Sequence, residues 1–141
     1  MDKKRILIVE DHPDSRELFV LILTRLGYDI AEAVSGLEAI DQARAAHPDL
    51  ILMDLGLLGI TGDEATARIK ADPATKDIPV IVYTAFHTES ALVERALAAG
   101  ASEVLHKPIS VPDLQEKVHR YLTSDKPPDI NTPSVTSSIL R

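Results

Sequence analysis

The chain has 141 residues, of which 45% are hydrophobic and 26% charged, and its formal net charge is −7 with a sequence pI near 5.1. This composition suits one globular domain with a core of ordinary size, and the absence of cysteine excludes a disulfide framework and a thiolate metal site. The acidic balance argues against nucleic acid as a direct partner, since phosphate contacts need clustered lysine and arginine, and it is compatible with a bound cation.

The N-terminus does not predict a signal peptide or a membrane anchor. The apolar run at 6–9 follows basic residues, but it has only four residues before Glu10 and is too short for the apolar region of a signal peptide. No stretch approaches the roughly 18 apolar residues of a membrane span. Together with the absence of cysteine, this predicts a cytoplasmic protein without membrane contact.

Short apolar runs alternate with longer segments of helical pattern along the chain. The runs are continuous and bounded by turn residues, as is typical of buried strands, and the segments between them carry apolar residues at helical spacing. In chain order the alternation predicts strand 5–9, helix 13–27, strand 28–34, helix 36–46, strand 49–53, helix 62–71, strand 79–83, helix 89–99, strand 102–106 and helix 111–123.

Local signals mark where these helices begin. Pro13 suits the first turn of a helix, where a missing N–H is not needed. Ser35 with Glu38, and Thr61 with Glu64, form capping-box patterns, in which the first side chain accepts a backbone N–H of the first turn. We therefore expect side-chain caps at both positions.

Continuous apolar strands separated by helices are typical of an α/β fold with a doubly wound parallel five-stranded sheet, covered on both faces and joined by right-handed crossovers. The pattern stops near Thr123. Residues 124–141 are rich in serine, threonine and proline and lack periodicity. We therefore expect one domain over 1–123 and a flexible C-terminal tail or linker over 124–141.

Polar residues stand where the predicted strands end, which is where open α/β sheets place their functional sites. Glu10 and Asp11 follow the first strand, Asp54 the third, Thr84 the fourth and Lys107 the fifth. Three converging carboxylates would repel one another, and a divalent cation together with one lysine cancels their charge. Mg²⁺ fits best, because it prefers oxygen ligands. A carboxylate paired with metal and lysine can act as a nucleophile toward phosphorus, with the threonine donating to a phosphoryl oxygen.

The segments "ILIVEDHPDSRELF", "DLILMDLGLLGITG", "PVIVYTA" and "GASEVLHKPIS" resemble the receiver domain of two-component response regulators, the CheY-like superfamily, over about residues 4 to 123. The resemblance implies the flavodoxin-like strand order 2-1-3-4-5. It also implies a protein that catalyses its own phosphorylation and dephosphorylation but is not a conventional turnover enzyme.

The resemblance assigns a role to each candidate residue. Asp54 would accept the phosphoryl group as an acyl phosphate, and Thr84 and Lys107 would contact its oxygens. Glu10 and Asp11 would bind Mg²⁺, with Asp11 the direct ligand, and the backbone carbonyl of Gly56 would complete the metal set. The Lys107–Pro108 peptide is expected to be cis, as in the family.

The family also implies partners. The phosphoryl donor would be a histidine kinase or a histidine phosphotransfer protein, and the signal would pass to a downstream protein target from a monomer or weak dimer. "TAF" at 84–86 and "KPISV" at 107–111 are similar to stand-alone receivers of the DivK type. The alternative is a receiver excised from a larger response regulator or hybrid histidine kinase.

Three positions depart from the common receiver pattern. Leu58 replaces a usual proline four residues after the phosphoacceptor. Val104 replaces the aromatic that normally reorients on phosphorylation, so that either the switch is carried otherwise or phosphate passes without a strong surface change. Glu10-Asp11 is a familiar variant of an Asp-Asp pair. Phe86 is a candidate cover for the site or a packing residue.

On the first helix, Val20 and Leu23 point away from the stripe of Leu18, Leu21 and Ile22 at 100° per residue. They would form either a docking patch for a kinase or phosphotransfer helix bundle, or part of the core. Two other function classes stay open. One is a Mg²⁺-dependent phosphohydrolase, although such enzymes place a second aspartate where this chain has glycine. The other is a pseudo-receiver that binds partners without phosphorylation.

Overall fold

The structure, a computed structural model, describes residues 3–85 and 91–123 of the chain. Its strands are β1 (Arg5–Val9), β2 (Asp29–Ala33), β3 (Leu50–Asp54), β4 (Val80–Thr84) and β5 (Glu103–His106). Its helices are α1 (Pro13–Arg25), α2 (Gly36–Ala46), α3 (Gly62–Ala71), α4 (Ala91–Ala98) and α5 (Val111–Leu122). All pairs of neighbouring strands are parallel, and the order β2-β1-β3-β4-β5 confirms the predicted topology.

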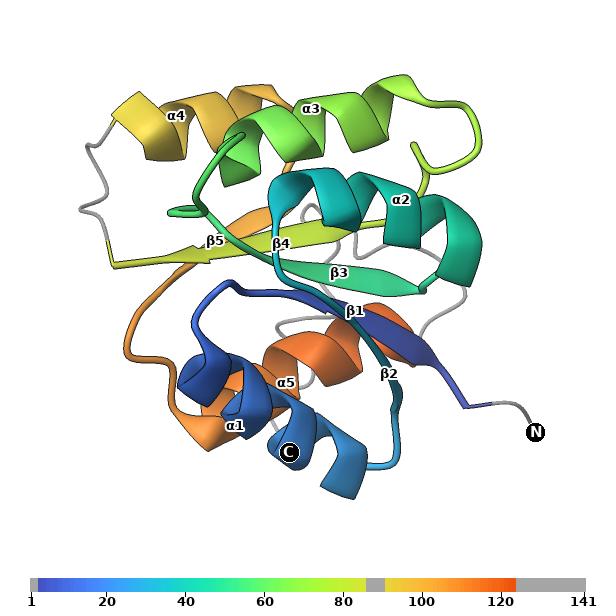
Figure 1. The fold of residues 1–141 in the computed structure, drawn as a ribbon. Coiled ribbons are helices and arrows are strands. Elements are labelled where there is room, and N and C mark those ends of the chain that lie inside the picture. The colour runs from blue at the N-terminus through green and yellow to red at the C-terminus, as the bar shows by residue number, and fades with distance from the viewer. Residues whose placement is uncertain (1–2, 86–90, 124–141) are drawn as a thin grey trace, which may run out of the picture.

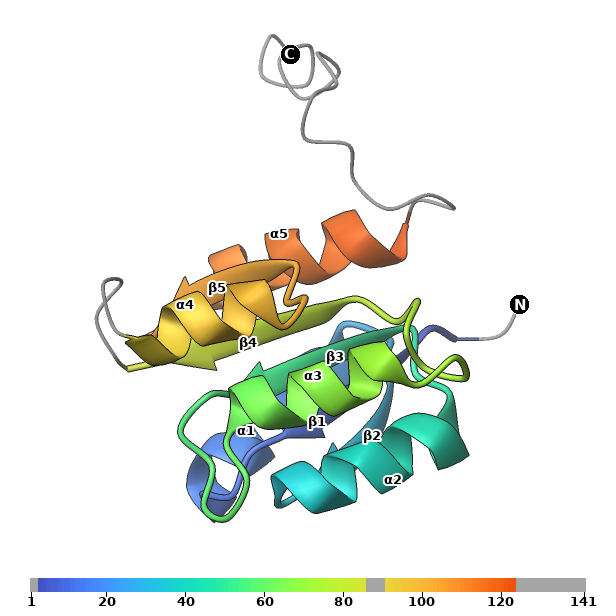
Figure 2. The same cartoon turned by 90° about the horizontal axis from the view of Figure 1, so that it is seen from above.

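The helices cover both faces of the sheet (Figures 1 and 2). Helices α1 and α5 lie on one face, and α2, α3 and α4 lie on the other. Because side chains alternate along a strand, β1 contributes residues to the cores on both faces of the sheet. Ile6 and Ile8 pack with Leu23 of α1, whereas Leu7 and Val9 pack on the opposite face. This double burial explains why the strands are continuously apolar rather than alternating.

Strands β3 and β4 end one residue later than predicted at the carboxyl edge of the sheet. Asp54 is the last residue of β3 and Thr84 the last of β4, and the register pairs Asp54 with Tyr83 and Thr84 with His106. The predicted start of α4, Phe86 and the tail over 124–141 lie outside the described residues.

The predicted helix caps are confirmed in one case and wrong in the other. The Ser35 hydroxyl accepts the Glu38 N–H at 3.1 Å. Thr61 occupies the N-cap position of α3 but makes no side-chain cap bond. The start of α3 is fixed instead by close packing, because a Cβ on Gly62 would overlap the carbonyl oxygen of Asp54 and stand 2.9 Å from Leu55 Cα.

Of the two alternatives for Val20 and Leu23, a docking patch or part of the core, the structure supports the core. Leu23 is fully buried and Val20 is half-buried, because α1 packs a broad apolar face against the sheet and the core beneath it. The exposed apolar residues of α1 are Leu18 and Leu21, at 57% and 49% exposure.

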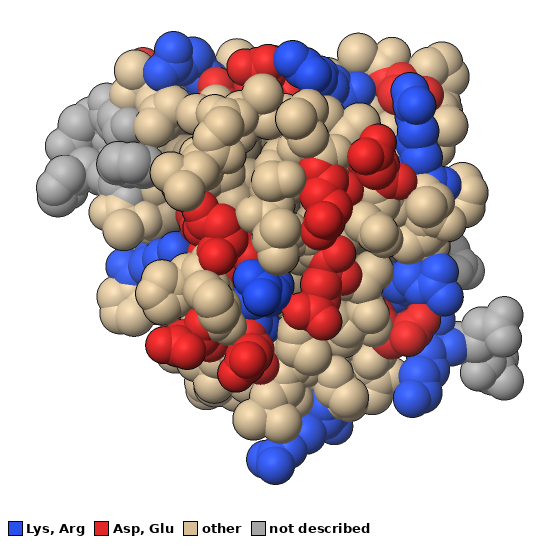
Figure 3. Space-filling view, viewed as in Figure 1, with Lys and Arg blue, Asp and Glu red and all other residues tan. Residues whose placement is uncertain are grey.

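The surface in view in Figure 3 carries acidic side chains interspersed with lysine and arginine. That face offers no broad basic area of the kind that tracks a phosphate backbone. Within 3–85 and 91–123, no helix combines the length and the apolar character that crossing a membrane requires.

Candidate functional site

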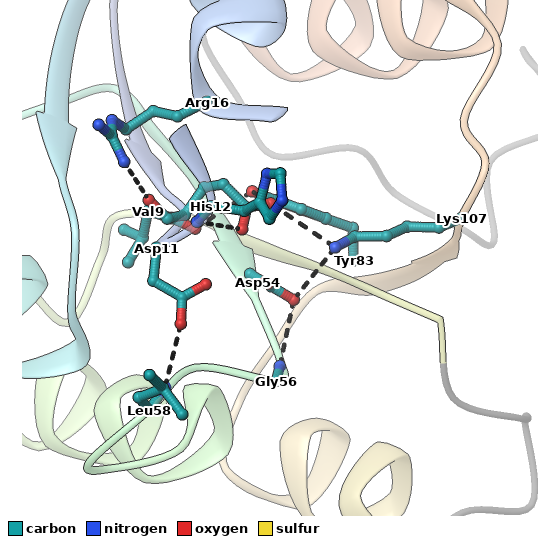
Figure 4. A network of polar contacts seen from close by, with 10 residues as sticks. Val9, Asp11, His12, Arg16, Asp54, Gly56, Leu58, Tyr83 and Lys107 are labelled. Atoms are coloured by element: carbon teal, nitrogen blue, oxygen red, sulfur yellow. Dashed lines mark hydrogen bonds and ion pairs between the residues drawn. The ribbon is translucent and has the colours of Figure 1, made fainter. Parts of the chain in front are cut away.

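Three carboxylates converge at the carboxyl edge of the sheet, as the sequence predicted (Figure 4). Glu10 and Asp11 follow β1, Asp54 ends β3, and these strands are neighbours in the sheet. Each residue offers one carboxylate oxygen, and these oxygens lie within 4.8 Å of one another. Glu10 and Asp54 are only 1% and 6% exposed, whereas Asp11 is partly exposed and forms the solvent side of the cluster.

Lys107, which follows β5, brings a positive charge to this cluster. Its Nζ lies 3.6 Å from Oε1 of Glu10 and 3.6 Å from Oδ1 of Asp54. With Asp11 included, three carboxylates face one ammonium, which leaves a formal charge of about −2 that a divalent cation matches. The Lys107–Pro108 peptide is cis, as expected.

The surroundings of Glu10 shift the pKa of its carboxyl group. Burial raises the pKa of Glu10 above its usual value, and the nearby Asp54 charge adds to that rise. The His12 N–H, which donates to Oε2 at 3.1 Å, and the Lys107 ammonium act in the opposite direction. A cation bound here would stabilise the ionised form further.

Asp54 is held from below by the turn that follows it. The Gly56 N–H donates to Asp54 Oδ1 at 3.1 Å, so that the backbone fixes the same oxygen that faces Lys107. The close approach of Gly62 to the Asp54 carbonyl brackets the end of β3 from the other side. The carboxylate therefore stands on a rigid strand end rather than on a loop.

The departure at position 58 has a structural consequence. The backbone N–H of Leu58 donates to Oδ2 of Asp11 at 3.3 Å, a bond that proline cannot make. Its side chain is 79% exposed. In this chain the loop thus adds a donor to the most exposed carboxylate of the cluster.

Thr84 lies between the strands that carry Asp54 and Lys107. It is 1% exposed, and its backbone carbonyl accepts the Lys107 N–H at 2.8 Å. This bond ties the end of β4 to the residue that carries the ammonium. The structure therefore brings all five predicted side chains, and Gly56, to one edge of the sheet.

Two residues that contact Glu10 were not predicted from the sequence. The Tyr83 hydroxyl donates to Oε1 of Glu10 at 3.2 Å and to the Val9 carbonyl at 3.1 Å. Arg16 of α1 donates from Nη1 to the Glu10 carbonyl at 3.0 Å and pairs through Nε with Glu32 at 3.2 Å. The signal for the tyrosine was present, because it is the one polar side chain before Thr84 in the run "VIVYT".

The chain matches the family of response regulator receiver domains over residues 6–119. It belongs to that family. The polar-differentiation response regulator DivK of Brucella abortus (strain S19) is 42% identical over 119 residues, which cover 84% of this chain and 96% of DivK. DivK of Brucella anthropi is 40% identical over the same shares of both chains.

Solved structures give the same family. The receiver domain of sensor histidine kinase PA1611 from Pseudomonas aeruginosa superposes with a TM-score of 0.80 at 32% identity, covering 87% of this chain and all of that one. The chemotaxis protein CheY4 of Vibrio cholerae has a TM-score of 0.80 at 26% identity and covers 86% of this chain and 100% of its own. The PA1611 crystal holds a magnesium ion in its active-site cleft.

This receiver domain therefore belongs to two-component signalling, in which receivers interact with histidine kinases and downstream targets. Receiver domains bind Mg²⁺ at an acidic site. The donor set here fits that ion, because Glu10, Asp11 and Asp54 supply only carboxylate oxygens and Mg²⁺ prefers oxygen.

Proposed function

We propose that this receiver domain accepts a phosphoryl group from a phosphohistidine donor onto Asp54 in a Mg²⁺-dependent reaction. The observation that carries the proposal is the convergence of three carboxylates with the Lys107 ammonium 3.6 Å from Asp54 Oδ1. A structural ion pair needs one carboxylate for one lysine. Two additional buried or half-buried acids beside it are costly unless a cation joins them.

In the proposed reaction an oxygen of Asp54 attacks phosphorus, the bond between phosphorus and the donor imidazole nitrogen breaks, and the imidazole leaves with that electron pair. Glu10, Asp11, Asp54 and the Gly56 carbonyl would hold Mg²⁺, which would supply two positive charges beside the transferred group. Lys107 and Thr84 contact the other phosphoryl oxygens and stabilise the charge that develops there. Water later attacks the phosphorus of the acyl phosphate, the bond between phosphorus and the Asp54 oxygen breaks, and inorganic phosphate leaves, which restores the carboxylate.

The donor is proposed to dock on a groove between α1 and α5. This groove encloses about 560 Å³ and has a largely apolar lining, which includes Leu18, Phe19, Ile22, Ile109 and Leu114. Lys107 and Ala85, the neighbour of Thr84, line its end nearest the site. An amphipathic helix of a histidine-containing phosphodonor domain, seated in this groove, would carry its histidine to the edge where Asp54 lies.

We further propose that residues 1–123 form the functional unit, acting in the cytoplasm on a downstream protein, and that 124–141 serve as a tail or linker. The chemistry applies equally to a stand-alone receiver and to one within a longer regulator, because every residue that it uses lies between 10 and 107.

The test is an intact-mass measurement after incubation with Mg²⁺ and acetyl phosphate. One added phosphoryl group is expected in the wild type, and none in Asp54→Asn or after removal of Mg²⁺ with EDTA. Asp41→Asn, which changes an exposed carboxylate of α2, should label like the wild type. Labelling that survives in Asp54→Asn would refute the assignment. Mg²⁺ binding without any labelling, even from a phosphohistidine donor, would identify a pseudo-receiver instead.

A further inference from the structure

Tyr83 has no direct role in the proposed phosphoryl transfer. It sits on β4 next to Thr84 and opposite Asp54 in the strand register, and it is 1% exposed. Its side chain lies on the face covered by α1 and α5, among the aliphatic residues of that core. A buried phenol needs a hydrogen-bond partner for its hydroxyl, and here that partner is Glu10 of the acidic cluster.

The hydroxyl reaches across β3 to the end of β1. It donates to Oε1 of Glu10 at 3.2 Å and to the carbonyl of Val9 at 3.1 Å, so that one proton is shared between the carboxylate and the strand that carries it. The other oxygen of Glu10 is held by the His12 N–H at 3.1 Å. Both oxygens of this buried carboxylate are therefore oriented by the protein itself.

The ring of the same residue supports the lysine. Lys107 Nζ lies 5.1 Å from the ring centroid of Tyr83, within the range of a cation–π contact. Phe19 of α1 packs against the ring edge-on, with centroids 5.0 Å apart and an interplanar angle of 62°. The ring is thus fixed from α1, and in turn it limits the positions that the ammonium can take.

We propose that Tyr83 is a positioning residue of this receiver site: its hydroxyl orients Glu10 for the metal, and its ring orients Lys107 for the phosphoryl group. An aliphatic residue would fill the same core position but would supply neither contact. The inference rests on the proposed function, because it concerns how the same metal and phosphoryl group are held.

The two contacts are separable by substitution. Tyr83→Phe removes the hydroxyl and keeps the ring, so Mg²⁺ affinity should fall by about tenfold, the usual effect of losing a partner that orients a ligand. The phosphorylation rate at saturating Mg²⁺ should stay within about twofold of the wild-type rate, since the ring that contacts Lys107 is kept. Tyr83→Leu removes the ring as well, and should also lower the rate at saturating Mg²⁺.

The chain offers a matched control in Tyr121 of α5. Its hydroxyl donates to Oε2 of Glu103 at 3.0 Å, so Tyr121→Phe deletes the same kind of bond, from a phenol to a carboxylate, outside the acidic cluster. Mg²⁺ affinity of Tyr121→Phe should equal that of the wild type. A general loosening of the fold would instead affect the two phenylalanine variants alike.

The deciding experiment is a double-mutant cycle in Mg²⁺ affinity, measured by titration calorimetry at 25 °C on proteins shown by circular dichroism to be folded. If the tyrosine acts through Glu10, Tyr83→Phe should weaken binding about tenfold in the wild type and change it by less than about twofold in a Glu10→Gln background. Equal Mg²⁺ affinity of Tyr83→Phe and wild type, or an equal loss of affinity in both backgrounds, would overturn the role of Tyr83 but leave the proposed function standing. A wild-type protein that binds no Mg²⁺ would overturn the proposed function and this inference with it.

Discussion

Neutralising the proposed phosphoacceptor should stabilise the metal-free protein. Asp54→Asn keeps the size of the side chain and an oxygen for the Gly56 N–H, but it removes one of three crowded negative charges. We therefore expect its free energy of unfolding to exceed that of the wild type in EDTA, although the substitution removes the ion pair with Lys107.

The magnitude follows from the distances in the cluster. At the upper separation of 4.8 Å, and at an effective dielectric constant of about 20, each like-charge pair costs about 3.5 kcal/mol. The repulsion of Asp54 by Glu10 and Asp11 together is about 7 kcal/mol, and its attraction to Lys107 at 3.6 Å offsets about 4.6 kcal/mol of this. Asp11 and Lys107 are partly exposed, so solvent screening reduces the difference to about 1–2 kcal/mol.

The assay is urea or thermal unfolding at pH 7.5 and low salt, with Asp41→Asn as the control for net charge. Asp54→Asn should gain about 3–8 °C in melting temperature in EDTA, and the control much less. Saturating Mg²⁺ should reverse the order, because the wild type binds the ion with one more carboxylate and gains more from it. The reasoning is refuted if Asp54→Asn is the less stable protein in EDTA, or if Mg²⁺ stabilises both equally.

The dependence on pH has a definite sign. The pKa of Glu10 is raised above 4.5 in the folded protein, so between these two pKa values the folded chain binds more protons than the unfolded chain. The contribution of Glu10 to stability is therefore lost as the pH rises through its folded pKa. Protonating Glu10 also relieves its repulsion of Asp54, so the advantage of Asp54→Asn in EDTA should shrink as the pH falls toward 4.5.

Three further outcomes are expected. Leu18→Ser, in the α1–α5 groove, should slow transfer from a phosphorylated histidine phosphotransfer domain but not labelling by acetyl phosphate, whereas Leu97→Ser, changed at a similarly exposed position on α4, should leave both rates unaltered. Gly62→Ala should lower the free energy of unfolding by about 1–3 kcal/mol in a urea titration, since its Cβ would overlap the Asp54 carbonyl; an unchanged midpoint would contradict this. Burial, with the Glu103 charge adding to it, raises the pKa of Tyr121 to about 12, so stability should be lost as the pH rises from about 10 to 12 and Tyr121→Phe should flatten that loss.

The fold and the location of the site were predictable because they depend on patterns along the chain. Runs that are apolar at every position indicate strands buried on both faces, and parallel strands place their carboxyl ends together. Asp54, Thr84 and Lys107 each follow from that rule. The strand bounds shifted by one residue at both ends of β2, β3 and β4 and at the start of β5. β3 and β4 end one residue later than predicted because ladder pairing continues through Asp54 and Thr84.

The features that the sequence did not predict depend on how side chains are oriented in three dimensions. The rotation of α1 about its axis decides whether Leu23 or Leu21 meets solvent, and helical spacing alone gives two stripes without saying which one faces the sheet. The reach of Tyr83 to Glu10 spans an intervening strand, and no pairing rule along the sequence connects residues 74 or 73 positions apart. The cap at Thr61 failed because close packing of Gly62 sets the start of α3.

The valine at position 104 limits how this receiver could report the proposed phosphorylation of Asp54. Val104 packs in the core on the α2–α4 side of the sheet, paired with Val82 of β4, and carries no ring that could reorient. Tyr83, whose ring contacts Lys107, lies on the opposite face, and its hydroxyl already donates to Glu10.

Lys107 connects the acidic cluster directly to the α1–α5 groove at the surface. Its ammonium contacts Glu10 and Asp54, and the residue lines the α1–α5 groove together with Pro108 and Ile109. A phosphoryl group on Asp54 would draw the ammonium away from Glu10, because a dianion attracts it more strongly than one carboxylate does. We therefore expect the proposed phosphorylation of Asp54 to reshape this groove first, so that the surface proposed to receive the donor is also the surface that changes after transfer.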